Sequence, residues 1–245
     1  MFETFAALLF AHVLADFVLQ TNWMAARKRH PGVLLLHGVM VLLTAQIALG
    51  QFSAWPLLVL ALAHLMIDAV KTYGGFDSLT GFLTDQAAHL LSLLVVSLLF
   101  PTLWHSGFWA SWPKIAPHMP ALMTLIAGAL LATRAGGFAT GLLMRGHAVS
   151  DDPEDQGLPG GGATIGHLER GLIYLLVLSG NLSGIGFLVA AKSILRFGTV
   201  SGDRKATEYV IIGTLFSFGW ALIVALLIQK LLIPLPPLEI APKPT

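Results

Sequence analysis

Pairs of histidine and aspartate recur four residues apart inside apolar stretches of this chain. His64 and Asp68 are the only polar side chains in the run PLLVLALAHLMIDAV. The same spacing occurs in the segments HVLAD (His12 and Asp16) and DQAAH (Asp85 and His89). Residues four apart lie on one face of a helix, so each pair can direct both side chains toward one point.

We expect these pairs to meet at one depth of a membrane, together with a further histidine. Counted from the cytoplasmic helix ends at about 1.5 Å per residue, the aspartates and His37 lie roughly 6–9 Å deep and the other histidines about 8–15 Å deep. Nothing in the hydrophobic pattern requires this agreement. The predicted ligands are His12, Asp16, His37, His64, Asp68, Asp85 and His89.

Metal binding is the chemistry that this set of side chains indicates. A lone ionisable side chain at such a depth is costly, so three aspartates and four histidines need mutual compensation. Imidazole and carboxylate suit zinc, manganese or iron, and the chain has no cysteine that would supply a thiolate. Seven ligands exceed the four of a tetrahedral zinc, so we expect one or two divalent ions, with zinc preferred. The alternative is that histidines and aspartates only pair with one another through hydrogen bonds.

Basic residues of the C-terminal half form a second candidate set. They lie in the segments HLER and AAKSILRF and within the apolar stretch before residue 144. Arginine offers paired donors and lysine a point charge, so the set predicts a basic surface that holds the phosphate of a substrate beside the metal. The alternative is membrane anchoring and local ion pairing. Together with Lys71, which could instead simply reach the membrane interface, the predicted substrate-binding residues are Lys71, Arg134, Arg170, Lys192 and Arg196.

The composition is that of an integral membrane protein. Of the 245 residues, 56% are hydrophobic and 11% are charged, against about a quarter charged in soluble domains. Since apolar runs of about 20 residues span a bilayer as helices, we predict an all-α, polytopic helix bundle. We expect the lipid bilayer and a membrane lipid or other amphiphilic substrate as partners, and no nucleic acid. The apolar runs cover roughly 2–23, 32–50, 54–72, 83–100, 120–144, 171–195 and 207–233.

The distribution of basic residues predicts the orientation. Arg27, Lys28 and Arg29 follow the first apolar run, and cytoplasmic loops carry an excess of such residues. We therefore expect a retained first span with the N-terminus outside, in the inner (cytoplasmic) membrane of a bacterium. The tryptophan-rich segment 101–119 is then an interfacial segment on the outer face.

The run 171–195 does not fit a simple crossing. A full crossing would carry Lys192 and the basic residues after it outside, and the sequence SGNLSGIG interrupts a helix in its middle. We favour a re-entrant hairpin with arms 171–179 and 185–196, which leaves six transmembrane helices, and seven transmembrane helices are the alternative. The chain then comprises a four-helix His/Asp half (1–100), the outer segment (101–119), a second helical half with the hairpin and the basic surface (120–233) and a proline-rich tail (234–245).

Several longer motifs resemble a known family. They are AHVLADFVLQTNWMAARKR, AHLMIDAVK, FLTDQAAHLL, GHLERGLI, IGFLVAAKSILRFG and DRKATEYVIIGTLFSF, which together extend over nearly the whole chain. The sequence resembles the bacterial and phage integral-membrane family called domain of unknown function 3307, which implies a membrane location but no activity. A looser similarity, confined to His/Asp-rich membrane helices, links it to membrane-bound metal-dependent hydrolases.

A hydrolase is the leading functional hypothesis. The metal centre would open to the cytoplasmic leaflet and cleave a lipid-like or other amphiphilic ester, foremost a phosphoester, with Asp85 or Asp16 as the general base. The chain has no GxSxG motif that would indicate a serine nucleophile. A divalent-cation or proton-coupled transporter is the first alternative, and a non-catalytic scaffold with a structural metal is the second.

Overall fold

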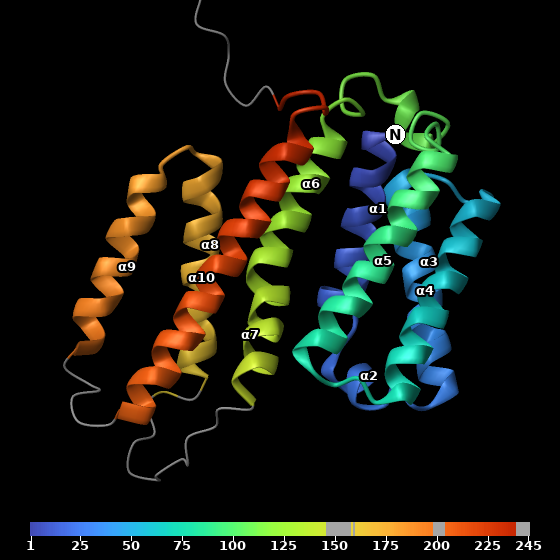
Figure 1. The fold of residues 1–245 in the computed structure, drawn as a ribbon. Helices are drawn as coiled ribbons and strands as arrows, with labels where there is room; N and C mark the ends of the chain where they lie inside the picture. The colour runs from blue at the N-terminus through green and yellow to red at the C-terminus, as the bar shows by residue number, and fades with distance from the viewer. Residues whose placement is uncertain (146–157, 159, 198–203, 239–245) are drawn as a thin grey trace, which may run out of the picture. The chain divides into compact units, whose positions relative to one another are not determined.

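The computed structural model describes residues 1–145, 158, 160–197 and 204–238, and these residues form helices joined by turns, without strands. Six of the described helices are long and apolar enough to cross a membrane (Figure 1). The prediction of a polytopic helical bundle is confirmed. The six spans are Phe2–Leu19, Pro31–Leu49, Trp55–Gly74, Leu79–Leu99, Met119–Met144 and Thr207–Leu232.

The chain divides into two compact units, of which the first comprises Met1–Ala127 and the residues from Lys230 onward. Its centre is a closed ring in which each of four helices contacts the next, and the last contacts the first. In Figure 1 the ring runs from blue to green. The four helices are α1 (Phe2–Leu14), α3 (Pro31–Leu49), α4 (Trp55–Gly74) and α5 (Leu79–Leu99).

Small residues on α1 allow its neighbours to pack closely against it. Ala6, Ala7 and Ala11 are 0–2% exposed. In lipid, burying apolar surface brings no gain over lipid contact, so helices associate through close van der Waals packing that small side chains permit. A short helix, α2 (Asn22–Ala26), and the loop after it connect α1 to α3.

Local signals set the helix ends. Pro31 begins α3, where its missing N–H costs nothing, and the N-cap His30 accepts a hydrogen bond from the backbone N–H of Gly32 at 3.2 Å. Gly50 ends α3 with a left-handed φ of 64°, a conformation that is unfavourable for residues with a side chain. Ser78 caps α5 by accepting a hydrogen bond from the N–H of Gly81 at 3.0 Å.

The tryptophan-rich segment folds back onto the ring instead of lying only along a membrane interface. The Trp109 indole donates to Ile47 O at 2.7 Å, the Phe108 N–H donates to Gly50 O at 2.8 Å, and Trp104 is buried. Thr4 donates to Pro101 O at 3.0 Å, which ties the same segment to α1. The ends of α1 and α3 are therefore closed off by protein at the side away from the loop that carries Lys28.

The second unit comprises Gly128–Gln229. It contains the end of α6 (Met119–Leu130), a π-helical turn η3 (Leu131–Ala135), α7 (Gly136–Met144), α8 (Gly161–Leu178), α9 (Leu182–Phe197) and most of α10 (Arg204–Leu232).

Residues 171–195 do not form one continuous helix, so the alternative of a seventh transmembrane helix across that run is wrong. α8 and α9 contact each other on either side of a turn at Ser179–Asn181, where Gly180 has a left-handed φ of 73°. The predicted hairpin is confirmed, although α8 begins ten residues before the predicted arm, because glycine-rich residues 161–166 also join the helix. A re-entrant position of this hairpin in the membrane stays a prediction.

Single cysteines in this cysteine-free chain test the topology. We expect Ser111→Cys to react with an impermeant maleimide in intact cells, whereas Arg29→Cys reacts only after permeabilisation. Ser179→Cys, at the hairpin turn, is expected to stay unlabelled in intact cells, because a re-entrant turn does not reach the outer aqueous phase. Labelling of Ser179→Cys at the rate of Ser111→Cys would contradict the re-entrant hairpin.

Candidate metal centre

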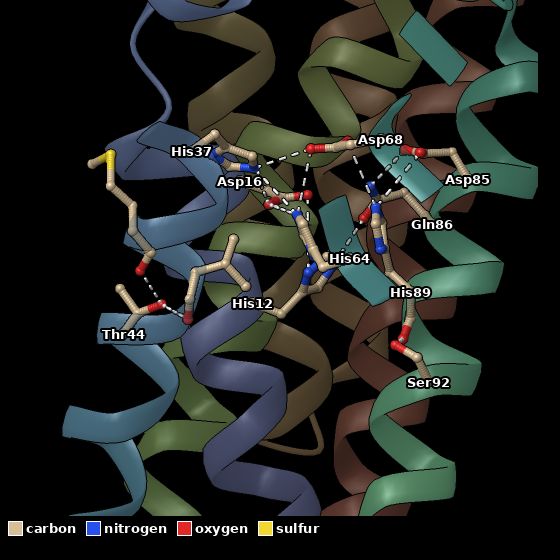
Figure 2. A network of polar contacts seen from close by, with 12 residues as sticks. His12, Asp16, His37, Thr44, His64, Asp68, Asp85, Gln86, His89 and Ser92 are labelled. Carbon is tan, nitrogen blue, oxygen red and sulfur yellow. Dashed lines mark hydrogen bonds and ion pairs between the residues drawn. The ribbon is translucent and has the colours of Figure 1, made fainter. Parts of the chain in front are cut away.

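The seven predicted side chains converge inside the helix ring of the first unit (Figure 2). Their side chains are only 1–8% exposed. The helices place them at a common level: His37 lies six residues after the start of α3, Asp68 six before the end of α4, and Asp85 six after the start of α5. The residues brought together are His12, Asp16, His37, His64, Asp68, Asp85 and His89.

Four ligand atoms lie at the spacing of a tetrahedral metal site. His37 Nε2 and His64 Nε2 are 3.2 Å apart, and each lies 3.3 Å from Asp16 Oδ1. Asp68 Oδ2 lies 3.4 Å from His37 Nε2 and 3.6 Å from His64 Nε2. A tetrahedral zinc with bonds of about 2.0–2.1 Å holds its ligand atoms about 3.3–3.4 Å apart. Five of the distances among these four atoms are therefore near the spacing of zinc ligands, and we call the four atoms the tetrahedral set.

His37 Nε2 and His64 Nε2 share a hydrogen bond, whereas the four His–Asp distances fit hydrogen bonding less well. Bonds of the N–H···O type have donor–acceptor distances of about 2.7–3.2 Å, shorter than all four His–Asp distances in the tetrahedral set. Asp16 Oδ1, buried between two imidazoles, has no hydrogen-bond partner within the described part of the chain. A buried carboxylate oxygen without a donor is costly, whereas a cation would satisfy it.

Asp68 also faces a second group of ligand atoms. Its Oδ1 lies 3.8 Å from His89 Nε2, which lies 3.6 Å from Asp85 Oδ1. The three residues offer ligand atoms within 4.8 Å of one another. The two oxygens of Asp68 therefore point to different groups, an arrangement that suits a carboxylate bridging two ions.

A π-helical turn positions Asp16. The turn η1 (Ala15–Leu19) continues α1 and ends at Gln20, whose N–H donates to Ala15 O at 2.9 Å. Asp16 lies 3.9 Å from His12 Nδ1 on its own helix, farther than the 3.3 Å to each histidine of the tetrahedral set. The four-residue spacing predicted that Asp16 pairs with His12. The wider π turn instead directs Asp16 toward the neighbouring helices.

Two lysines neutralise part of the centre. Lys28 Nζ lies 2.6 Å from Asp68 Oδ2, and Lys71 Nζ lies 2.7 Å from Asp85 Oδ2. Against the three carboxylates, Asp16 included, these two ammonium groups leave one formal negative charge when the histidines are neutral. Part of the compensation that the aspartates require therefore comes from lysine side chains. By residue type and spacing, the group could also hold a metal ion.

Sequence analysis missed two participants. Lys28 was assigned only to the basic loop that sets orientation, although buried aspartates require cations and this loop supplies the next basic side chains after Asp16. Gln86 was not considered: its Nε2 donates to Asp85 Oδ2 at 3.2 Å, and its Oε1 lies 3.3 Å from His12 Nε2. A glutamine beside an aspartate carries no signal by itself, because only the helix packing directs it inward.

The predicted basic residues of the C-terminal half lie in the second unit, where two of them make local bonds. Lys192 Nζ lies 2.6 Å from Glu169 Oε2. Arg170 donates from Nε to Thr133 O at 3.1 Å, a carbonyl within the π turn η3, and from Nη1 to Ser217 Oγ at 2.9 Å. These contacts agree with the alternative of local pairing.

The other two residues of the set are Arg134 and Arg196. Arg134 lies in the π turn η3, and the side chain of Arg196, in α9, lies outside the described part of the chain. Phosphate binding by the whole set stays a prediction.

Comparison with known proteins gives a family resemblance without an activity. No curated protein and no solved structure matches the chain. Residues 4–113 match the family described as protein of unknown function DUF3307, a shorter region than the motifs above suggested. This region contains all seven ligand candidates together with Lys28 and Lys71, so the part of the chain that is similar to the family is the part that builds the centre.

Proposed function

We propose that the centre binds one or two divalent metal ions and hydrolyses an amphiphilic ester, foremost a phosphoester. The tetrahedral set (Asp16, His37, His64 and Asp68) would hold the first ion, for which zinc is preferred over manganese and iron. Asp85 and His89, with Asp68 shared, would hold a second ion. The observation that carries this proposal is the set of five distances of 3.2–3.6 Å among the four atoms.

A bound divalent cation would lower the pKa of a coordinated water toward about 7 and polarise an ester oxygen. Of the two predicted general bases, Asp85 fits the role better. Its Oδ2 is held by Lys71 and Gln86, while its buried Oδ1 has no hydrogen-bond partner within the described residues. With one ion at the tetrahedral set, Oδ1 is therefore oriented by its neighbours and able to accept a proton from water, whereas with a second ion it would serve as a ligand. Asp16, whose Oδ1 faces two imidazoles, fits a ligand role.

The position of the centre supports an amphiphilic substrate. Six residues from a helix end correspond to about 9 Å along the helix axis, near the boundary between headgroups and hydrocarbon. The centre lies toward the end of the ring that carries Lys28, which the basic loop assigns to the cytoplasmic side. A lipid ester of the cytoplasmic leaflet presents its ester bonds at this depth.

The half of the ring farther from Lys28 offers little support for a transporter. Leu8, Leu49 and Leu57 are fully buried there, so the interior is filled by apolar side chains. The Ser97 hydroxyl donates to Leu93 O and the Thr44 hydroxyl to Val41 O, within their own helices, so they offer no chain of exposed ligands. A carrier requires access from both faces, and a hydrolase requires only one.

Metal content tests the centre. We expect purified protein to carry one to two ions per chain, and His37→Ala or His64→Ala to lower metal affinity at least ~10–100-fold, the loss that even residues supporting a ligand produce. Elemental analysis and competition with a chromogenic chelator measure this. His105→Ala is the matched control, because His105 lies outside the ring and its side chain is 61% exposed. Only trace metal in folded protein never treated with chelator would leave the hydrogen-bonded pairs as the explanation.

Turnover tests the hydrolase. We expect Asp85→Asn to keep the ion of the tetrahedral set but to lower kcat about 10²–10⁴-fold, since it removes the proton acceptor. Asp16→Asn should lose metal and activity together. Release of phosphate or fatty acid from phospholipids and polyprenyl phosphates provides the readout. Metal-loaded wild-type protein that cleaves no such ester would favour the structural-metal scaffold.

A further inference from the structure

A groove between α4 and α5 adjoins the candidate metal centre. It has a volume of about 360 Å³, within the range of about 300–1,000 Å³ typical of ligand sites. Asp85 lines this groove and also belongs to the second ligand group of the centre. The groove therefore connects the outer surface of the ring with a residue of the centre.

The lining is mainly apolar, with Lys71 near the shallow end and Met66 and Ala88 at the deep end. Lys71 lies three residues from the end of α4, whereas Met66 lies eight from it. On α5, Ala88 lies nine residues from the helix start, also at the deeper level. At about 1.5 Å per residue, the charged group lies about 4–5 Å and the apolar groups about 12–14 Å from the helix ends. This placement suits an amphiphile whose headgroup lies beside Lys71 and whose chain follows the apolar lining into the bilayer.

Lys71 gives the shallow end a positive group. Its side chain lines the groove and is 25% exposed, while that of its partner Asp85 is 3% exposed, and its ammonium lies 2.7 Å from Asp85 Oδ2. A charge at this depth is costly without a counter-ion, and Asp85 supplies one to Lys71. A divalent cation bound by Asp85 would compete with Lys71 for that carboxylate and leave the ammonium for an anionic headgroup.

We propose that this groove binds a lipid with a phosphate headgroup, its phosphate at Lys71 and one hydrocarbon chain along Met66, Val70 and Ala88. The inference rests on the proposed function, because it names the substrate class of that centre. It also assigns Lys71, rather than the basic residues of the second unit, as the headgroup contact.

Photolabelling in nanodiscs tests the groove without requiring turnover. The probe is phosphatidic acid with a photoreactive acyl chain, in phosphatidylcholine nanodiscs, and the comparison probe is phosphatidylcholine with the same chain. We expect labelling of peptides from α4 and α5, stronger with phosphatidic acid. Met66→Trp and Ala88→Trp, which fill the groove, should lower labelling about tenfold, which corresponds to ~1.4 kcal/mol of binding.

Matched controls come from the same helices. Leu62→Trp and Leu91→Trp change exposed apolar residues that do not line the groove, and both should label like the wild type. Lys71→Gln should abolish the preference for phosphatidic acid while chain labelling remains. Excess inorganic phosphate should not displace the probe, because the chain contributes to binding.

Several results would contradict lipid binding in the groove. These are equal labelling of the groove-filling and control variants, equal labelling by the two probes, or displacement by inorganic phosphate alone. Hydrolysis that persists in Met66→Trp and Ala88→Trp without labelling would overturn the groove and keep the proposed function. Labelling as expected, with no hydrolysis of any phosphate-bearing lipid, would support the groove and count against the hydrolase.

Discussion

The structure of the first unit depends on the compensation of three carboxylates inside a ring of membrane helices. Taking an ion out of water costs several kcal/mol even after relaxation, and removing one partner of a buried pair costs about 3–5 kcal/mol. Lys28 reaches Asp68 from the loop after α2, and Lys71 reaches Asp85 from α4. These pairs fix the loop to α4 and α4 to α5. Asp68 and Asp85 would find no equivalent cation in lipid.

One negative charge remains after these pairs, and two physical solutions exist for it. A protonated imidazole would neutralise it, since His37 Nε2 and His64 Nε2 lie 3.2 Å apart and each lies near Asp16 Oδ1 and Asp68 Oδ2. A proton between them serves one nitrogen as donor and leaves the other as acceptor only. A cation accepts lone pairs from both nitrogens and from the oxygen at once, and the nearly equal distances suit that case better.

The sequence predicted those features that follow from helical period and hydropathy. Convergence of the seven ligands required only straight helices at comparable depth, and the ring supplies them. Lys28 and Gln86 could not be placed, because a loop path and a helix rotation are set by tertiary packing. The π turns at Asp16 and Thr133 have no sequence signal, yet the second one exposes the carbonyl that binds Arg170. Arg170, which the sequence predicted to bind phosphate, therefore has a local partner that only the backbone geometry reveals.

The two halves of the ring have opposite chemistry, and this difference determines from where the centre can be reached. At one end, the segment around Trp109 is bonded to α3, and Thr4 is bonded to Pro101, which holds the helix ends together over an apolar interior. At the other end, Lys28 and Lys71 are 15% and 25% exposed, so the charged pairs extend from the buried centre toward the surface. Rigid packing at the first end keeps the tetrahedral set in place. Access must then come from the lysine end, or laterally between α4 and α5, where Asp85 borders the groove.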